Sequence, residues 1–259
     1  MSRNTALDRV SQVLDRLLDP SHGCPWDLKQ TPETLRLYLL EETHELLAAL
    51  EQGDRSAIKE EMGDCLFLIF FLAKVFQKKG LFDLAEVLDL AADKMIARHP
   101  HIFGSGRNLN SAEEVKAQWH ELKQKEKEGS LLAGVPEALP ALLKAHRLSE
   151  RAGRVGFDWP DPEAVISTLD LELTELRQAL ARKDLARTAD ELGDVLFTLA
   201  NLARHLKINS EDALRRTNNR FTRRFKYIEA KLAAEGRRPA EAGLEEMDRL
   251  WAEAKSEGL

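Results

Sequence analysis

The segment EEMGDCLFLIFFLA at residues 60–73 recurs 130 positions later as DELGDVLFTLANLA at residues 190–203. In the first copy Leu66, Ile69 and Leu72 are three residues apart, which places them along one face of an α-helix. The second copy has leucine at all three matching positions. The repeat therefore predicts the same apolar helix in each half of the chain.

The two copies also share four acids in the order E-x-x-E, a gap, then E-x-G-D. The acids are Glu42, Glu45, Glu61 and Asp64 in the first copy, and Glu172, Glu175, Glu191 and Asp194 in the second. Each copy begins with a helix start, at residues 31–33 and 161–163, that combines a capping side chain, a proline and an acid. A repeat this long indicates a duplicated domain.

No stretch of the sequence shows the sustained alternation of a β-strand, so we expect an all-α fold. The charged segment from Lys123 to Pro136, which contains glycine, marks the joint between the copies. We expect a first domain at residues 1–125, a linker at residues 126–136 and a second domain at residues 137–259.

The spacing of the acids predicts a metal site in each copy. Residues three apart on a helix face the same way, so two packed helices would gather four carboxylates. Such carboxylates repel one another unless a cation joins them. Acids on helices are usually solvated, but these adjoin apolar runs, and Gly63 and Gly193 precede the two aspartates. Because glycine inside a helix costs about 1 kcal/mol, we expect a helix or a ligand to approach closely there.

Carboxylate oxygens favour Mg²⁺, with Mn²⁺ as a substitute, and Mg²⁺ commonly completes its shell with phosphate oxygens. The sequence therefore predicts a phosphate ester or anhydride as the substrate. Between Arg215 and Arg238 the chain has nine Lys or Arg and two acids, which suits polyphosphate binding. The alternative for this segment is an amphipathic helix with a solvated basic face.

Composition narrows the class of protein. The chain has 259 residues, 43% of them hydrophobic, and a formal net charge of −6, which argues against a nucleic-acid coat protein. Cys24 and Cys65 form no C-x-x-C pair, so a zinc ribbon or a disulfide framework is excluded. We expect no signal peptide, no membrane span, no direct nucleic-acid binding and a cytoplasmic location.

The two halves differ around the acids. The stripe beyond Asp194 continues with polar residues, whereas the first half is apolar at the matching positions. The polar residues are Thr198, Asn201 and His205, and the matching residues are Leu68, Phe71 and Val75. The arginine-rich helix has only Lys94 and Arg98 as counterparts, although Trp119 lies at a position similar to that of Trp251 in the other half. We expect the second half to hold the main catalytic site, with Asn201 among its substrate-binding residues. The first half would hold a weak, altered or regulatory metal site.

The chain resembles the MazG nucleoside triphosphate pyrophosphohydrolases in their tandem two-domain bacterial form. The resemblance spans nearly the whole chain, and its motifs lie at residues 23–27, 41–45, 61–64, 98–103, 154–159, 172–175, 190–194, 201–206 and 220–225. It implies helices from two subunits assembled into four-helix-bundle units, and hence a homodimer. It also implies Mg²⁺-dependent hydrolysis of ribo- and deoxyribonucleoside triphosphates, over a broad range of bases, to monophosphate and pyrophosphate.

Carried onto this sequence, the resemblance implies metal binding and catalysis by Glu172, Glu175, Glu191 and Asp194. It also implies phosphate binding by Arg220, Arg223 and Arg224, and contact of Trp251 with the nucleotide.

Two other classes stay open from the residues. One is a di-iron or di-manganese carboxylate protein, for which Glu41 and His44 supply a single E-x-x-H pair. The other is a nucleotide-sensing adaptor that binds metal and ligand without turnover.

Overall fold

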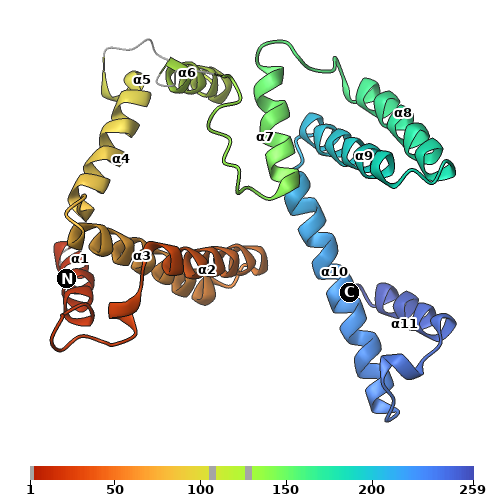
Figure 1. Ribbon diagram of the computed structural model, residues 1–259, viewed down its shortest axis with the longest axis horizontal. Helices are drawn as coiled ribbons and strands as arrows, with labels where there is room; N and C mark the ends of the chain where they lie inside the picture. The colour runs from red at the N-terminus through yellow and green to blue at the C-terminus, as the bar shows by residue number, and fades with distance from the viewer. Residues whose placement is uncertain (1–2, 105–108, 126–129) are drawn as a thin grey trace. The chain divides into compact units, whose positions relative to one another are not determined.

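The computed structural model describes residues 3–104, 109–125 and 130–259, and every regular element within these ranges is a helix. The all-α prediction is confirmed. The chain divides into two compact units, Met1–Lys123 and Gln124–Leu259 (Figure 1).

The first unit is built around a pair of long helices, α2 and α3, with shorter helices on either side of them in sequence. Its elements are α1 (Arg3–Leu17), η1 (Asp27–Lys29), α2 (Pro32–Gln52), α3 (Arg55–Lys78), α4 (Leu84–Arg98), α5 (Pro100–Phe103) and α6 (Ala112–Lys125), the last of which extends past the division between the units.

Capping residues explain where the helices of the α2–α3 hairpin begin and end. Thr31 caps α2 by accepting from the backbone N–H of Thr34, and Pro32 occupies the first turn, as predicted. Gly53 ends α2 in a left-handed conformation, with φ of 70°. Asp54 then caps α3 by accepting from the next backbone amides. A two-residue connection therefore folds the two helices back on each other.

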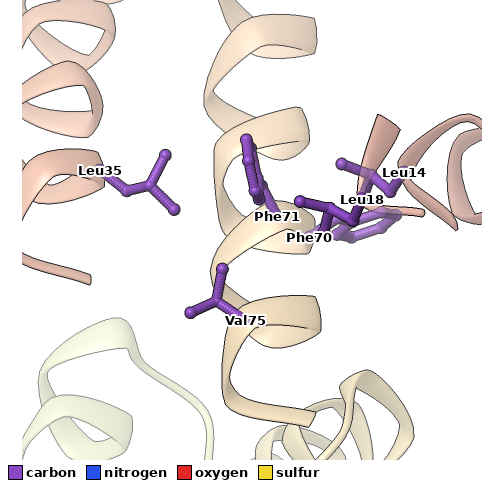
Figure 2. Close-up of a cluster of buried hydrophobic side chains, with 6 residues drawn as sticks. All are labelled: Leu14, Leu18, Leu35, Phe70, Phe71 and Val75. Atoms are coloured by element: carbon purple, nitrogen blue, oxygen red, sulfur yellow. The ribbon is translucent and has the colours of Figure 1, made fainter. Parts of the chain in front are cut away.

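The core of the first unit lies where α1 and α2 meet α3. Phe70 and Phe71 of α3 are buried against Leu14 and Leu18 of α1, and Leu35 of α2 approaches from the other side (Figure 2). These side chains form one apolar cluster that fixes α1 against the middle of α3.

The second unit repeats the helix pair and adds a second pair beyond it. Its elements are α7 (Ala141–Gly153), α8 (Pro162–Ala181), α9 (Leu185–His205), α10 (Ser210–Ala234), η2 (Pro239–Glu241) and α11 (Leu244–Ser256). Asp161 caps α8 as predicted, and Asp184 caps α9. At the α8–α9 turn Lys183 takes the left-handed conformation, with φ of 55°, at the position that Gly53 holds in the first unit.

The second helix pair of this unit is formed by α10 and α11. Ile228 and Leu232 of α10 are buried against Leu250 of α11. Lys231 on α10 also pairs with Glu253 on α11 at 2.8 Å. The apolar stripe expected in the arginine-rich segment therefore packs against the last helix of the unit.

Part of the predicted linker, residues 126–129, lies outside the described residues. Within residues 130–136, the backbone carbonyls of Ala133 and Gly134 accept hydrogen bonds from Arg151 of α7. This end of the segment is therefore tied to the second unit. No helix in the described part of the chain is long and apolar enough to cross a membrane.

Candidate metal centres and active site

Three of the four acids of the second quartet meet on the α8–α9 hairpin. Glu172 of α8 and Glu191 and Asp194 of α9 each offer a carboxylate oxygen, and these oxygens all lie within 4.8 Å of one another. Glu191 is buried. Glu175, one turn beyond Glu172, lies outside this trio.

The first quartet also yields a trio, but a different one. Glu42 and Glu45 of α2 and Glu61 of α3 bring their oxygens within the same 4.8 Å, and Asp64 lies outside the group. Each duplicated hairpin therefore brings three carboxylates together, but a different acid of the quartet lies outside the group in each.

The carboxyls in both units are perturbed by their surroundings. Burial raises the pKa of Glu172, and the charges of Asp194, Glu175 and Glu191 raise it further. In the first unit, burial followed by the charges of Glu45, Asp64 and Glu61 raises the pKa of Glu42. Loss of hydration and neighbouring carboxylates likewise raise the pKa of Glu61. In both clusters the crowding of carboxylates therefore disfavours the ionised form of these side chains.

The donor chemistry of both trios suits a hard divalent cation. All six ligand groups are carboxylates, and neither trio includes a histidine or a cysteine. A divalent cation between the oxygens would remove the repulsion that raises the pKa values. The residues therefore fit a metal of the Mg²⁺ type at both hairpins.

Arg187, which was not predicted as a site residue, contacts two acids of the second quartet. Its Nη2 lies 3.3 Å from Glu175 Oε2, and its Nε lies 3.1 Å from Glu191 Oε1. The signal was available, because Arg187 precedes Glu191 by four residues on one helix face. The matching residue in the first unit is Ala57.

The predicted nucleotide-binding residues lie on the other helix pair of the second unit. The Arg224 guanidinium lies 5.4 Å from the centroid of the Trp251 ring, and its Nε donates to the Leu259 carbonyl at 2.7 Å. Phe221, 57% exposed, lies 5.1 Å from Trp251 between ring centroids. Arg220 and Arg223 are exposed on the same helix.

Within one chain the structure does not bring these arginines beside the carboxylates. Arg220 Nη2 donates to Thr217 Oγ1 at 2.8 Å, and Arg224 Nε donates to the Leu259 carbonyl, so both guanidinium groups contact groups other than the quartet. Figure 1 shows α10 running away from the α8–α9 hairpin. Among the described residues, no hydrogen bond or ion pair therefore joins Arg220, Arg223 or Arg224 to the acids of the second quartet.

The polar stripe beyond Asp194 faces the interior. Thr198 is buried, and Asn201 is 1% exposed. Asn201 Oδ1 accepts from Arg204 Nε at 3.0 Å, and Arg204 also pairs with Asp158. The role of Asn201 in substrate binding stays a prediction, because the structure engages its side chain inside the unit.

The first unit carries an arginine–tryptophan pair that parallels Arg224 and Trp251. The Arg98 guanidinium lies 5.2 Å from the ring centroid of Trp119, and the His99 ring lies 5.0 Å from the same indole. Arg98 is buried. The first unit thus has a counterpart of the Arg224–Trp251 pair, but its arginine is buried.

The close neighbour expected at the helix glycines is not found within the described chain. A Cβ built on Gly63 or Gly193 meets nothing within 4 Å. Of the two tryptophans before the hairpins, Trp159 donates from Nε1 to Thr168 Oγ1 at 2.9 Å, and Trp26 is 53% exposed. The faces of both metal hairpins at the glycines are therefore open.

These features define a class: an all-α protein of two tandem units, each with a carboxylate-lined helix hairpin suited to a divalent metal. The sequence model of the MazG nucleotide pyrophosphohydrolase domain matches the chain twice, at residues 30–103 and 161–228. The chain belongs to the MazG family.

Two relatives are similar over nearly their whole length. The nucleoside triphosphate pyrophosphohydrolase of Escherichia coli strain K12 is 39% identical over 98% of this chain and 98% of its own. The nucleoside triphosphate pyrophosphohydrolase/pyrophosphatase MazG of Thermotoga maritima is 37% identical over 96% of this chain and 95% of its own. A crystal structure of a mazG-related protein from Thermotoga maritima matches 45% of this chain and 98% of its own, with 30% identity and a TM-score of 0.40.

Proposed function

We propose that the chain is a nucleoside triphosphate pyrophosphohydrolase that releases pyrophosphate and a nucleoside monophosphate. The proposal includes a broad range of ribo- and deoxyribonucleotides as substrates, with nucleotide-pool housekeeping as the role. Family membership and the names of two relatives that match over nearly their full length support the activity. The observation that carries it in this chain is the trio of carboxylates Glu172, Glu191 and Asp194.

The cofactor in this proposal is Mg²⁺, with Mn²⁺ as a substitute. Glu172, Glu175, Glu191 and Asp194 would hold it in the second unit, and the quartet of Glu42, Glu45, Glu61 and Asp64 would form a second site. When bound, the cation neutralises charge on the phosphate oxygens and lowers the pKa of a bound water.

The side chains divide the remaining work. A carboxylate of the cluster orients the water that attacks the α-phosphorus and accepts its proton. Arg220, Arg223 and Arg224 bind the phosphates, since a guanidinium offers paired N–H donors to phosphate oxygens. Trp251 lies against the nucleotide. Charge that develops on the leaving pyrophosphate is then met by fixed cations.

A homodimer would complete this site. Leu192, Leu196 and Leu199 form one stripe of α9, each more than 40% exposed, and Met62, Leu66 and Ile69 form the matching stripe of α3. A second copy packed on these stripes would turn each hairpin into a four-helix unit. It could also supply the arginines that one chain keeps apart from its own acids. Sedimentation of the full chain tests this, and a monomer at micromolar concentration would contradict it.

The two units would differ in activity. Only the second unit carries exposed arginines on the helix beside its tryptophan, whereas Arg98 of the first unit is buried against Trp119. We assign the main catalysis to the second unit and a weak, altered or regulatory role to the first.

We expect no direct binding of nucleic acid.

The test is a panel of ribo- and deoxyribonucleoside triphosphates incubated with the full chain and Mg²⁺. Pyrophosphate and orthophosphate are measured separately, with a chelator as the control. The expected result is pyrophosphate in equal amount to the monophosphate. Orthophosphate alone would mean attack at the γ-phosphorus and would overturn the proposal, and nucleotide binding without either product would indicate a sensor.

A further inference from the structure

The two duplicated hairpins deal with the same crowding of acids in different ways. In the second unit the guanidinium of Arg187 lies between Glu175 and Glu191, with contacts of 3.3 Å and 3.1 Å. In the first unit the matching position is Ala57, whose methyl group offers no charge. One hairpin therefore has a built-in cation at its acids.

The presence of Arg187 coincides with a change in which acids converge. Glu45, the first-unit counterpart of Glu175, belongs to the trio of carboxylates on its hairpin. Glu175 does not belong to the trio of the second unit, and it is the acid that Arg187 contacts. The guanidinium thus links the one acid that lies outside the trio to Glu191, a member of the trio.

Arg187 also binds a member of the trio itself. Glu191 is buried, with a side chain only 9% exposed, whereas the side chains of Arg187 and Glu175 are about half exposed, at 53% and 51%. An ion pair to a buried carboxylate is screened less than a surface pair. A divalent cation that draws on both Glu175 and Glu191 must break these contacts.

We propose that Arg187 is an internal competitor of the divalent metal, which makes the second hairpin bind its cation more weakly than the first. The inference rests on the proposed metal sites and concerns their relative affinity. Metal entry releases the guanidinium from Glu175 and Glu191, so the fourth acid joins the site only when the cation is present. The first hairpin needs no such exchange, because Ala57 leaves its acids to one another.

The test measures Mn²⁺ binding to the full chain by the electron paramagnetic resonance of free Mn²⁺. Mn²⁺ binding by each hairpin is measured in a variant in which two acids of the other hairpin are replaced. Glu42→Gln with Glu61→Gln isolates the second unit, and Glu172→Gln with Asp194→Asn isolates the first. In these backgrounds we expect tighter binding by the first unit.

The decisive variants remove the guanidinium from the second hairpin or introduce one into the first. Arg187→Gln should tighten Mn²⁺ binding by the second unit about tenfold, the scale of a charged hydrogen bond. Ala57→Arg should weaken binding by the first unit to a similar extent. Arg182→Gln, at the end of α8, is the control for the loss of one positive charge, and Ala57→Gln is the control for added bulk. Thermal unfolding of each variant confirms that it is folded.

Two outcomes overturn the inference while the metal sites survive. Binding by Arg187→Gln that is unchanged or weaker would mean that Arg187 does not compete or that it organises the acids. Binding unaffected by Ala57→Arg would mean that the position does not reach the quartet. Absence of Mn²⁺ binding in the unaltered chain and in Arg187→Gln alike would instead remove the proposed metal sites, and this inference with them.

Discussion

His205 Nε2 lies 3.0 Å from Asp158 Oδ1, so the residue at the end of α9 is joined to the loop that leads into α8. Arg204 contacts the same carboxylate and also donates to Asn201. The turn at Lys183 closes one end of the metal hairpin, and this network closes the other. A Cβ on Gly153 would come within 2.6 Å of Asp158 Oδ2, so glycine there leaves room for the carboxylate.

Asp158→Asn should destabilise the second unit by about 1–3 kcal/mol at pH 7, because Arg204 and His205 lose a charged acceptor. Burial alone would raise the pKa of Asp158, but hydrogen bonds from Arg204 and His205 outweigh it and lower the pKa. The folded state therefore gains stability above about pH 4, the unfolded value, and loses it as pH falls through the lowered pKa. Urea unfolding measured at pH 7 and again below about pH 4 checks this prediction. Asp170→Asn, at an exposed acid on α8, should show neither effect.

Glu172→Gln should reduce pyrophosphate release roughly hundredfold or more, the scale of losing a group that stabilises the transition state. Glu42→Gln should reduce pyrophosphate release only a few-fold, because Arg98 of the first unit is packed against Trp119. Steady-state rates with saturating Mg²⁺ make the comparison. Equal losses in the two variants would contradict the assignment of catalysis to the second unit.

Removal of metal should make stability fall as pH rises. Burial and neighbouring carboxylates raise the pKa values of Glu172 and Glu42. The folded state therefore holds protons that the unfolded state has lost above about pH 4.3, and its stability declines as pH rises through that window. Thermal unfolding with a chelator should show this decline, and Mg²⁺ should restore stability most at high pH. A melting temperature independent of Mg²⁺ at pH 8 would contradict the metal assignment.

Arg224→Lys should raise KM for a triphosphate about tenfold while the protein stays folded. Lysine keeps the charge but loses the planar fork that lies on Trp251 and donates to Leu259. Initial rates over a range of substrate concentrations separate KM from kcat. Arg238→Lys, at a side chain that is 80% exposed, is the matched control. The same KM in both variants would argue against phosphate binding by Arg224.

Lys183→Gly should stabilise the second unit by about 0.5–1 kcal/mol, because glycine adopts the left-handed conformation without the strain of a Cβ. Gly53→Lys should destabilise the first unit by a similar amount. Chemical unfolding of both variants measures the two changes in the free energy of unfolding. A loss of stability in Lys183→Gly would show that the lysine side chain contributes more than its backbone conformation costs.

Much of the architecture could be predicted from the sequence. The starts of α2 at Thr31-Pro32 and of α8 at Asp161-Pro162 are local signals, and the structure confirms both. The repeat spacing also identified acids that converge on each hairpin. These features depend on neighbours within one helix or one hairpin, which a sequence pattern can encode.

The side-chain partners of the acids were harder to predict. The spacing of Arg187 to Glu191 on α9 could have been noticed, but the contact of Arg187 with Glu175 crosses from α9 to α8 and has no such local signal. The burial of Asn201 depends on helices that are distant in the sequence, and its polarity alone indicated an open site. The separation of Arg220 from Asp194 follows from the direction in which α10 leaves α9, which the spacing of residues does not determine.

The turn at Lys183 has a practical consequence for protein engineering. The two hairpins take the same left-handed bend although one has glycine and the other has lysine, so the bend does not require glycine. The residue at the tip can therefore be changed about two helical turns away from the nearest acids, Glu175 and Glu191. Each hairpin is a suitable cassette for a reporter or an affinity tag placed at its tip.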